Sequence, residues 1–297
     1  MWNMSAIKFF LAVISLTTVI AVELPKNWEV CSRSLPEEEF SKCLDKAARD
    51  AVVSLAGGEN FSVPTIFPVE PLLVDNVKIG GSQGSVSLKQ EYKNIKLYGL
   101  TKDLEIHNHH LELDNGCLLT SDSFNPQVDF VADYKLDGKV LLLPVRGSGK
   151  SNITMCKYIC LYYSLIPYIN FKFNMLFLII TEICVYIRQL LLFEYLDGLK
   201  SHNELACEKY KKNGETYLKI KKYSVTFRPD KVKLNFDNLF NGDKVIGTQL
   251  NTFMNENADL LFKELQGPYE ETFSQVFTKL SNEVFSRVPM NKIFPPK

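Results

Sequence analysis

Three of the four histidines stand together in the run His107-Asn-His-His110, and imidazole side chains at such short spacing can bind a metal ion. On a β-strand, His107 and His109 would share one face, where both rings could chelate the same ion. No third ligand stands near them in the sequence. We therefore interpret the run as a solvated strand end, and we expect no metal ion and no other cofactor.

The segment Arg146-Gly-Ser-Gly-Lys-Ser151 is similar to the end of a phosphate-binding loop. The complete motif requires a glycine five residues before Gly149, where this chain has Pro144. The segment also follows an expected strand and opens no periodic helix, so no helix N-terminus is available to hold a phosphate. We interpret it as a basic turn.

Other catalytic patterns are missing from the sequence. No serine occupies a nucleophile elbow, no His-Glu-x-x-His motif occurs, and the cysteines lack the short paired spacing of a zinc cluster. The carboxylates of Glu37 to Glu39 fall in an early helical turn, where they complement the helix dipole. The 34 basic and 34 acidic side chains cancel, so no net charge attracts nucleic acid. We therefore expect neither an enzyme nor a nucleic-acid-binding protein.

The first 21 residues have the pattern of a secretory signal peptide. Lys8 precedes the apolar run Phe9 to Ile14, and Val19 and Ala21 suit cleavage after residue 21. A signal anchor that stays in the membrane is the alternative, but the run is shorter than the roughly 20 residues of a membrane span. We therefore expect a secreted, extracellular chain of residues 22–297 that is not held in a membrane.

Secretion would place the chain in an oxidising compartment, where cysteines form disulfides and asparagines in acceptor motifs are glycosylated. Among the seven cysteines, Cys31 and Cys43 are the best candidates for a disulfide, because both lie near the mature N-terminus and flank the start of a helix. Asn60-Phe-Ser and Asn152-Ile-Thr are acceptor motifs for N-glycosylation. We expect one disulfide between these cysteines and glycans at the two asparagines.

Two amphipathic helices are expected near the ends of the chain. Ser34-Leu-Pro-Glu37 predicts the start of the first, and apolar residues at helical spacing extend it to Gly57-Gly58. From Leu250 to Val284, apolar residues follow three-and-four spacing as one continuous stripe. Pro268 lies within this stripe and predicts a kink, because its ring removes a backbone donor.

Strands fill most of the sequence between the helices. From residue 69 to about residue 147, apolar and polar residues alternate, which indicates strands with one dry face. Val140 to Pro144 continues this sheet, and alternation returns between Tyr217 and Phe236. The dipeptides Gly80-Gly81, Asn115-Gly116 and Asp137-Gly138 separate the strands, and the last two predict hairpin turns. We expect one long antiparallel sheet, which can wrap the C-terminal helix and leave room for an elongated lipid.

Several segments carry a family resemblance. They are, in chain order, Pro71-Leu-Leu-Val-Asp75, Gly138-Lys-Val-Leu-Leu-Leu-Pro144, Gly149-Lys-Ser-Asn-Ile-Thr154, Asn238-Leu-Phe-Asn-Gly-Asp243, Phe253-Met-Asn-Glu-Asn257 and Glu264-Leu-Gln266. In these motifs the chain resembles the takeout and juvenile hormone-binding proteins of insects, over residues 22–155 and 198–297. The resemblance implies an α+β fold in which a strongly curved antiparallel sheet wraps a long helix and encloses an apolar tunnel. Such proteins carry juvenile hormone, fatty acids or other apolar ligands.

The cysteines refine the resemblance. Cys31 and Cys43 match the family's N-terminal disulfide. Juvenile hormone binders have a second disulfide, and Cys117 and Cys207 show no clear match to its positions. This difference favours a takeout-like member and leaves the pairing of Cys117 and Cys207 open.

Residues 156–197 depart from the family and from the rest of the chain, because they are rich in Ile, Leu, Phe and Tyr and lack caps, alternation and glycines. One interpretation is a transmembrane span, but Lys172, Glu182 and Arg188 leave no uncharged stretch of about 18 residues. A second is an apolar lid over the tunnel. We prefer a third, a translated intron, because its excision would join the two matching halves. Sequencing the transcript tests this hypothesis.

The leading hypothesis is a single-domain, monomeric, secreted carrier of a small apolar ligand. Apolar burial would supply the affinity. The side chains that we expect to line the tunnel are Tyr134, Val225, Phe236, Leu261, Leu265, Phe273 and Phe277. The alternative from another class is a membrane-tethered interaction protein that uses residues 156–197 as its anchor. An enzyme acting on the same lipid is a third option, which lacks a recognisable catalytic set.

Overall fold

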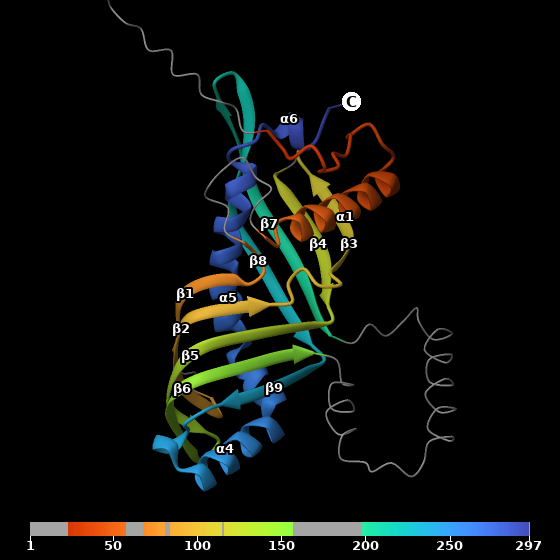
Figure 1. Ribbon diagram of the computed structural model, residues 1–297. Coiled ribbons are helices and arrows are strands. Elements are labelled where there is room, and N and C mark those ends of the chain that lie inside the picture. Colours follow the sequence, from red (N-terminus) through yellow and green to blue (C-terminus); the bar gives the residue numbers. More distant parts are fainter. Residues whose placement is uncertain (1–22, 58–67, 81–83, 115, 157–197, 297) are drawn as a thin grey trace, which may run out of the picture.

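The computed structural model describes residues 23–57, 68–80, 84–114, 116–156 and 198–296 (Figure 1). The expected signal peptide, Asn60 and residues 157–197 of the expected insertion lie outside this part of the chain. The helices are α1 (Glu37–Ser54), the short 3₁₀ helix η2 (Phe240–Gly242), α4 (Lys244–Glu256), α5 (Ala258–Phe285) and α6 (Met290–Ile293). The strands are β1 (Leu72–Ile79), β2 (Val86–Tyr98), β3 (Glu105–Glu112), β4 (Leu118–Asn125), β5 (Gln127–Val140), β6 (Leu143–Cys156), β7 (Leu199–Lys212), β8 (Glu215–Pro229) and β9 (Lys231–Phe236).

The strands form two antiparallel sheets, not the one long sheet that we expect from the alternation. One has the order β1-β2-β5-β6-β9 and the other the order β3-β4-β7-β8. Figure 1 shows the two sheets one above the other with their strands in different directions, and α5 extends along both. Because α5 contacts β8, β9, β1 and β2, it is the element that the two sheets share. The predicted α+β fold, with a long C-terminal helix against antiparallel strands, is confirmed.

The C-terminal helix is interrupted at Asn257, where the apolar spacing predicts no break. Asn257 has φ −112° and ψ 19°, and both its backbone N–H and its side-chain Nδ2 donate to the Phe253 carbonyl oxygen, at 3.2 and 2.8 Å. The backbone bond is an ordinary helical bond, whereas the side-chain bond to the same oxygen accompanies the non-helical backbone angles at which α4 ends. The following helix α5 then continues through Pro268 without stopping. The stripe is therefore carried by two helices instead of one.

Side chains of α4 and α5 form hydrogen bonds with one edge strand of each sheet, namely β9 of the five-stranded sheet and β8 of the four-stranded sheet. The Asn255 Oδ1 accepts from the backbone N–H of Leu234 at 2.8 Å, and its Nδ2 donates to the Leu234 carbonyl oxygen at 2.7 Å. The same two-bond pairing joins Asn251 to Phe236 and Asn282 to Ile220. Since edge strands otherwise present unpaired backbone groups, these amides fix the helices to the sheets.

The hairpin between β5 and β6 turns later than the sequence predicts. Asp137-Gly138 lies inside β5, where it pairs with both β2 and β6. A Cβ atom at Gly138 would clash with the Ser87 carbonyl oxygen, so this glycine permits a close approach of two strands and does not form a turn. The chain reverses at residues 141–142 instead, within Val140 to Pro144. The expectation that this segment continues the sheet therefore holds for Val140, Leu143 and Pro144, whereas Leu141 and Leu142 form the turn.

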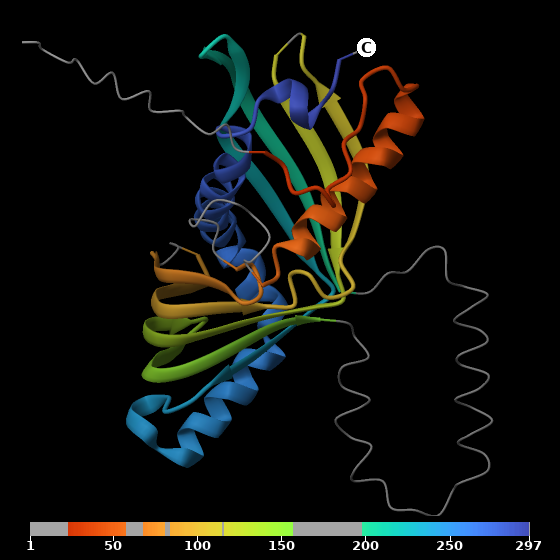
Figure 2. The same ribbon diagram turned by 45° about the horizontal axis from the view of Figure 1, so that its top comes forward.

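Two disulfides fix the half of the molecule that contains α1. Cys31 pairs with Cys43, as predicted, and ties the N-terminal segment to α1. Cys117 pairs with Cys207, which joins the start of β4 to β7 and settles the pairing that the sequence leaves open. The chain therefore carries a second disulfide. Figure 2 shows α1 lying across β3 and β4, and its buried Leu44 belongs to a small core beside α6.

Candidate functional site

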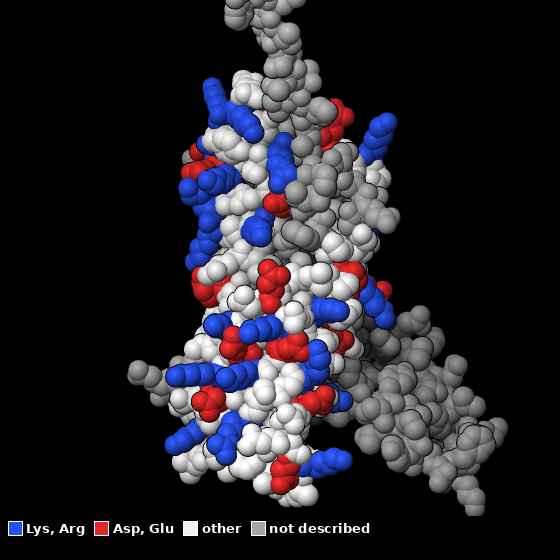
Figure 3. Space-filling model, turned by 60° about the vertical axis from the view of Figure 1, so that its left-hand side comes forward, with Lys and Arg blue, Asp and Glu red and all other residues white. Residues whose placement is uncertain are grey.

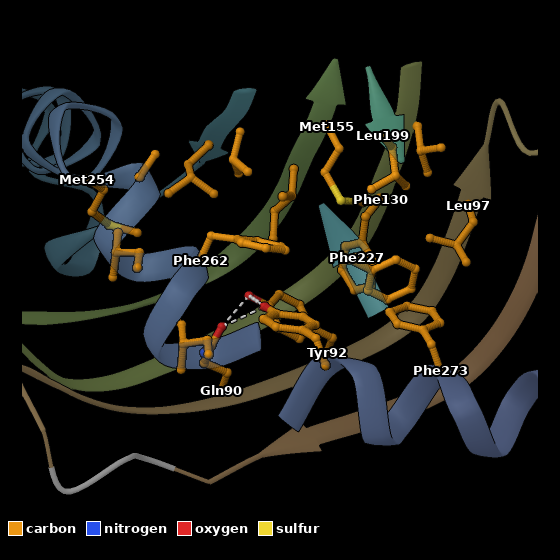
Figure 4. Close-up of a pocket in the computed structure, with 18 of the residues that line it drawn as sticks. Gln90, Tyr92, Leu97, Phe130, Met155, Leu199, Phe227, Met254, Phe262 and Phe273 are labelled. Atoms are coloured by element: carbon orange, nitrogen blue, oxygen red, sulfur yellow. Dashed lines mark hydrogen bonds between the residues drawn. The ribbon is translucent and has the colours of Figure 1, made fainter. Parts of the chain in front are cut away.

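An apolar cavity lies between the five-stranded sheet, the start of β7, the end of β8 and the helices α4 and α5 (Figure 4). The space that no protein atom occupies amounts to about 880 Å³, part of which opens to solvent. Every side chain that lines it is uncharged, and most are aliphatic or aromatic. Such a concave apolar site with few polar groups is typical of sites that bind small molecules.

Two periodicities place these side chains on the cavity wall. Residues two apart on a strand share a face, and residues three or four apart on a helix share a face. The strands and the loop after β2 contribute Leu88, Gln90, Tyr92, Leu97, Leu100, Val128, Phe130, Ile153, Met155, Leu199, Phe227, Val232, Leu234 and Phe236. The helices contribute Met254, Ala258, Leu261, Phe262, Leu265, Tyr269, Phe273 and Phe277.

Most of the side chains expected to line the tunnel do line this cavity, namely Phe236, Leu261, Leu265, Phe273 and Phe277. Tyr134 and Val225 do not, because they lie in the core that surrounds it. The Tyr134 hydroxyl donates to the Asp237 carbonyl oxygen, and its ring packs edge-on against Phe236 with the centroids 4.9 Å apart. Val225 is a buried residue of β8. Facing direction alone does not separate cavity from core, since both are apolar.

Three residues of the cavity wall carry polar groups, and they are not among the lining residues predicted from the sequence. Gln90 and Tyr92 follow Leu88 at spacing two on β2, so the alternation of this strand would have indicated them. Tyr269 lies on the apolar stripe of α5, and the spacing of this stripe does not indicate that its hydroxyl forms hydrogen bonds with residues of β2. Only the tertiary structure brings Tyr269 to Gln90 and Tyr92.

Gln90, Tyr92 and Tyr269 form a buried hydrogen-bonded cluster in the otherwise apolar wall. The Gln90 Oε1 accepts from the Tyr92 hydroxyl at 2.7 Å and from the Tyr269 hydroxyl at 2.9 Å, and the two hydroxyl oxygens lie 3.1 Å apart. Burial raises the pKa of both tyrosines well above the ordinary value. Both hydroxyls therefore stay protonated and act as donors at physiological pH.

The histidine run does not form a solvated strand end, which corrects that expectation. A bulge between His107 and His110 breaks the alternation of β3, so His107 and His109 have different surroundings. His109 is buried, and its Nδ1 lies 2.7 Å from the Asp45 Oδ1 on α1, whereas His107 is exposed. In the part of the chain that the structure describes, no group of three or more His, Cys, Asp or Glu side chains could hold a metal ion.

The segment Arg146 to Ser151 forms part of β6, so its interpretation as a basic turn is wrong. Its glycines allow the chain after β9 to pass close by, because a Cβ at Gly149 would lie 2.8 Å from the Asp237 carbonyl oxygen.

The predicted glycosylation site Asn152 also lies on β6, and its neighbour Ile153 lines the cavity. Asn152 therefore points to the opposite face. Its glycosylation stays a prediction.

An apolar cavity between a long helix and antiparallel sheets is the kind of site in which proteins bind small hydrophobic molecules. Comparison with known families matches residues 9–164 and 192–295 to the family described as haemolymph juvenile hormone binding protein (JHBP). The chain belongs to this family. The match is interrupted at residues 165–191, which fall inside the segment 156–197 that departs from the family motifs.

Individual relatives agree with this assignment. The chain is 20% identical to the circadian clock-controlled protein daywake of Drosophila melanogaster over 232 residues, which is 76% of this chain and 74% of that protein. The daywake protein of Drosophila yakuba is 19% identical over the same length. The crystal structure of Epiphyas postvittana Takeout 1 superposes with a TM-score of 0.63 at 21% identity, over 86% of this chain and 96% of Takeout 1. These likenesses confirm the takeout-like fold.

The described helices also bear on the membrane-tethered alternative. None of them is both long enough and apolar enough to span a membrane. The segment that this alternative uses as its anchor, residues 156–197, lies outside the described residues except for Cys156, the last residue of β6.

Proposed function

We propose that this protein is a secreted, monomeric carrier that binds one small apolar ligand, such as juvenile hormone, a fatty acid or a similar lipid, in the cavity between the sheet and α4 and α5. The observation that carries the proposal is the apolar, uncharged wall of this cavity among the described residues. A methylene group contributes about 0.8 kcal/mol on burial, so roughly 16 of them contribute about 13 kcal/mol. That sum exceeds most of the roughly 4–15 kcal/mol range for the cost of association, and the surplus over this cost is the binding free energy.

The aromatic wall gives the proposed ligand a shaped environment. The Phe273 ring packs against three other aromatic rings of the wall, with centroids 6.4 Å from Phe130, 5.9 Å from Phe227 and 6.0 Å from Phe277. Packed rings hold one another in fixed rotamers, so little side-chain freedom is lost when a ligand binds. We therefore expect the cavity to be largely formed before the ligand enters.

A cavity-filling substitution tests the proposal. Leu261 is buried on the cavity wall, and Leu261→Trp should fill part of the space and weaken binding of the fluorescent apolar probe N-phenyl-1-naphthylamine at least about tenfold. Val245→Trp is the matched control, because Val245 is 68% exposed on α4 and does not line the cavity.

Overpacking costs about 1–3 kcal/mol of stability, so thermal unfolding must show that the variant is folded. Ala258→Leu fills a smaller part of the same wall and serves if Leu261→Trp does not fold. Unchanged binding of the probe in folded variants of Leu261 or Ala258 would contradict a ligand in this cavity. Equal weakening by Val245→Trp would contradict it as well.

A further inference from the structure

The side-chain amide nitrogen of Gln90, a residue of the cavity wall, is a hydrogen-bond donor without a partner in the described part of the chain. Its side chain is 5% exposed and is the one amide among the described residues that line the cavity. Figure 4 shows its carbonyl oxygen joined by hydrogen bonds to the tyrosine hydroxyls. Its Nε2 atom is buried and has no hydrogen-bond partner among the described residues. An unpaired buried amide costs about 1–3 kcal/mol, so a ligand that supplies an acceptor gains at this position.

The tyrosine hydroxyls do not supply that acceptor, because both contact the Oε1 atom of the amide and neither contacts Nε2. Each hydroxyl has one proton, and the Tyr92 hydroxyl donates it to the Gln90 Oε1. Tyr269 donates its proton to the same oxygen at 2.9 Å or to the Tyr92 hydroxyl at 3.1 Å. Because the two hydroxyls hold the Oε1 atom, they fix which way the amide faces. The two N–H groups of Gln90 are then the free donors of this cluster.

The charge of the wall restricts which acceptor fits. Lys89 and Glu91 flank Gln90 on β2, and alternation directs their side chains to the other face of the sheet. They line a second, polar hollow with Lys78, Lys135 and Asp137, which Gln90 also borders. There Glu91 lies 3.5 Å from Lys78 and 3.6 Å from Lys93, and Figure 3 shows acidic and basic side chains interspersed on the molecular surface. No charged side chain lines the cavity among the described residues. An ionised carboxylate would lose its hydration there without gaining a cation.

We propose that the Gln90 Nε2 recognises an uncharged hydrogen-bond acceptor on the ligand, the carbonyl oxygen of an ester or a ketone, and thereby fixes the position of an apolar chain in the cavity. This inference rests on the proposed carrier function and narrows it to neutral lipids that carry such an oxygen. It sets esters and ketones apart from free fatty acids, whose ionised form the wall excludes.

Two ligands with the same number of non-hydrogen atoms test the inference in a cycle with two variants. Methyl tetradecanoate and heptadecane compete with the bound fluorescent probe in wild type, Gln90→Met and Leu88→Met. Both substitutions place a methionine on the same face of β2, and only the first removes the amide. We expect Gln90→Met to weaken ester binding relative to alkane binding by about 5–10-fold, the equivalent of one hydrogen bond. Leu88→Met should leave that ratio unchanged.

A second measurement does not depend on a variant that folds. In wild-type protein labelled with ¹⁵N, methyl tetradecanoate should shift the side-chain amide signal of Gln90, and heptadecane should not. Tetradecanoate should bind more weakly than its methyl ester at pH 8, and its affinity should rise as the pH falls and the carboxylate is protonated.

The outcomes separate this inference from the carrier function. If neither the ester nor the alkane binds wild-type protein, the proposed function fails. If both bind, while Gln90→Met leaves their ratio unchanged and the Gln90 signal does not respond to the ester, the carrier function stands and the role of Gln90 is refuted. Tetradecanoate that binds at pH 8 as tightly as its ester would refute the restriction to neutral ligands.

Discussion

Asn255→Ala tests whether amide side chains hold the C-terminal helices against the open sheet edges. The substitution removes both bonds to the backbone of Leu234 and a third, from Nδ2 to the Asn251 carbonyl oxygen at 2.8 Å. It leaves a backbone N–H and a carbonyl of β9 without these partners, at a net cost of about 1 kcal/mol or more for each bond. Alanine recovers about 0.7 kcal/mol through its helix propensity. We therefore expect the free energy of unfolding to fall by about 2–3 kcal/mol.

Urea unfolding followed by far-ultraviolet circular dichroism measures this loss, and the melting temperature should fall by roughly 5–10 °C. Gln249→Ala is the matched control, since Gln249 is an exposed residue of the same helix and its substitution should change stability by less than about 0.5 kcal/mol. A loss for Asn255→Ala that is no larger than the loss for the control would refute the edge-pairing argument.

Two further predictions concern stability. Burial lowers the pKa of His109 although Asp45 acts to raise it, so the unfolded chain binds this proton more readily than the folded chain. Stability should therefore fall as the pH drops below about 6.5, with a shallower fall in His109→Gln, measured as urea midpoints between pH 5 and pH 7.5. Gly138→Ala should destabilise the protein by more than about 1 kcal/mol because its Cβ meets the Ser87 carbonyl oxygen, whereas Gly267→Ala, which meets nothing within 4 Å in α5, should stabilise it by about 0.5–1 kcal/mol in thermal unfolding.

The sequence predicts those features that depend on neighbouring residues in the chain. Alternation over β2, β5 and β9 and the three-and-four spacing of α5 follow from the geometry of strands and helices, so the spacing identifies the apolar face. The same spacing indicated Leu261, Leu265 and Phe273, which do line the cavity. The resemblance of separate motifs then supplied the order in which these elements assemble.

Features that depend on distant parts of the chain were not predictable in this way. Gly138 resembles a turn residue, but its role is set by β2, which lies far before it in the sequence. The strand spacing predicts that His109 shares a face with His107, but a bulge in β3 separates the two, and His109 contacts Asp45 of α1. The division into two sheets likewise depends on pairing between strands, which the alternation within one strand does not encode.

Native mass spectrometry of the protein purified from its own tissue tests the central claim most directly. We expect a species that is heavier than the polypeptide and its modifications by the mass of one small molecule. Denaturation should release this molecule into the organic phase, where it is identified as an apolar compound. Protein that is consistently free of any such molecule, under conditions that preserve a known lipid–protein complex, would contradict the claim that this cavity carries a ligand.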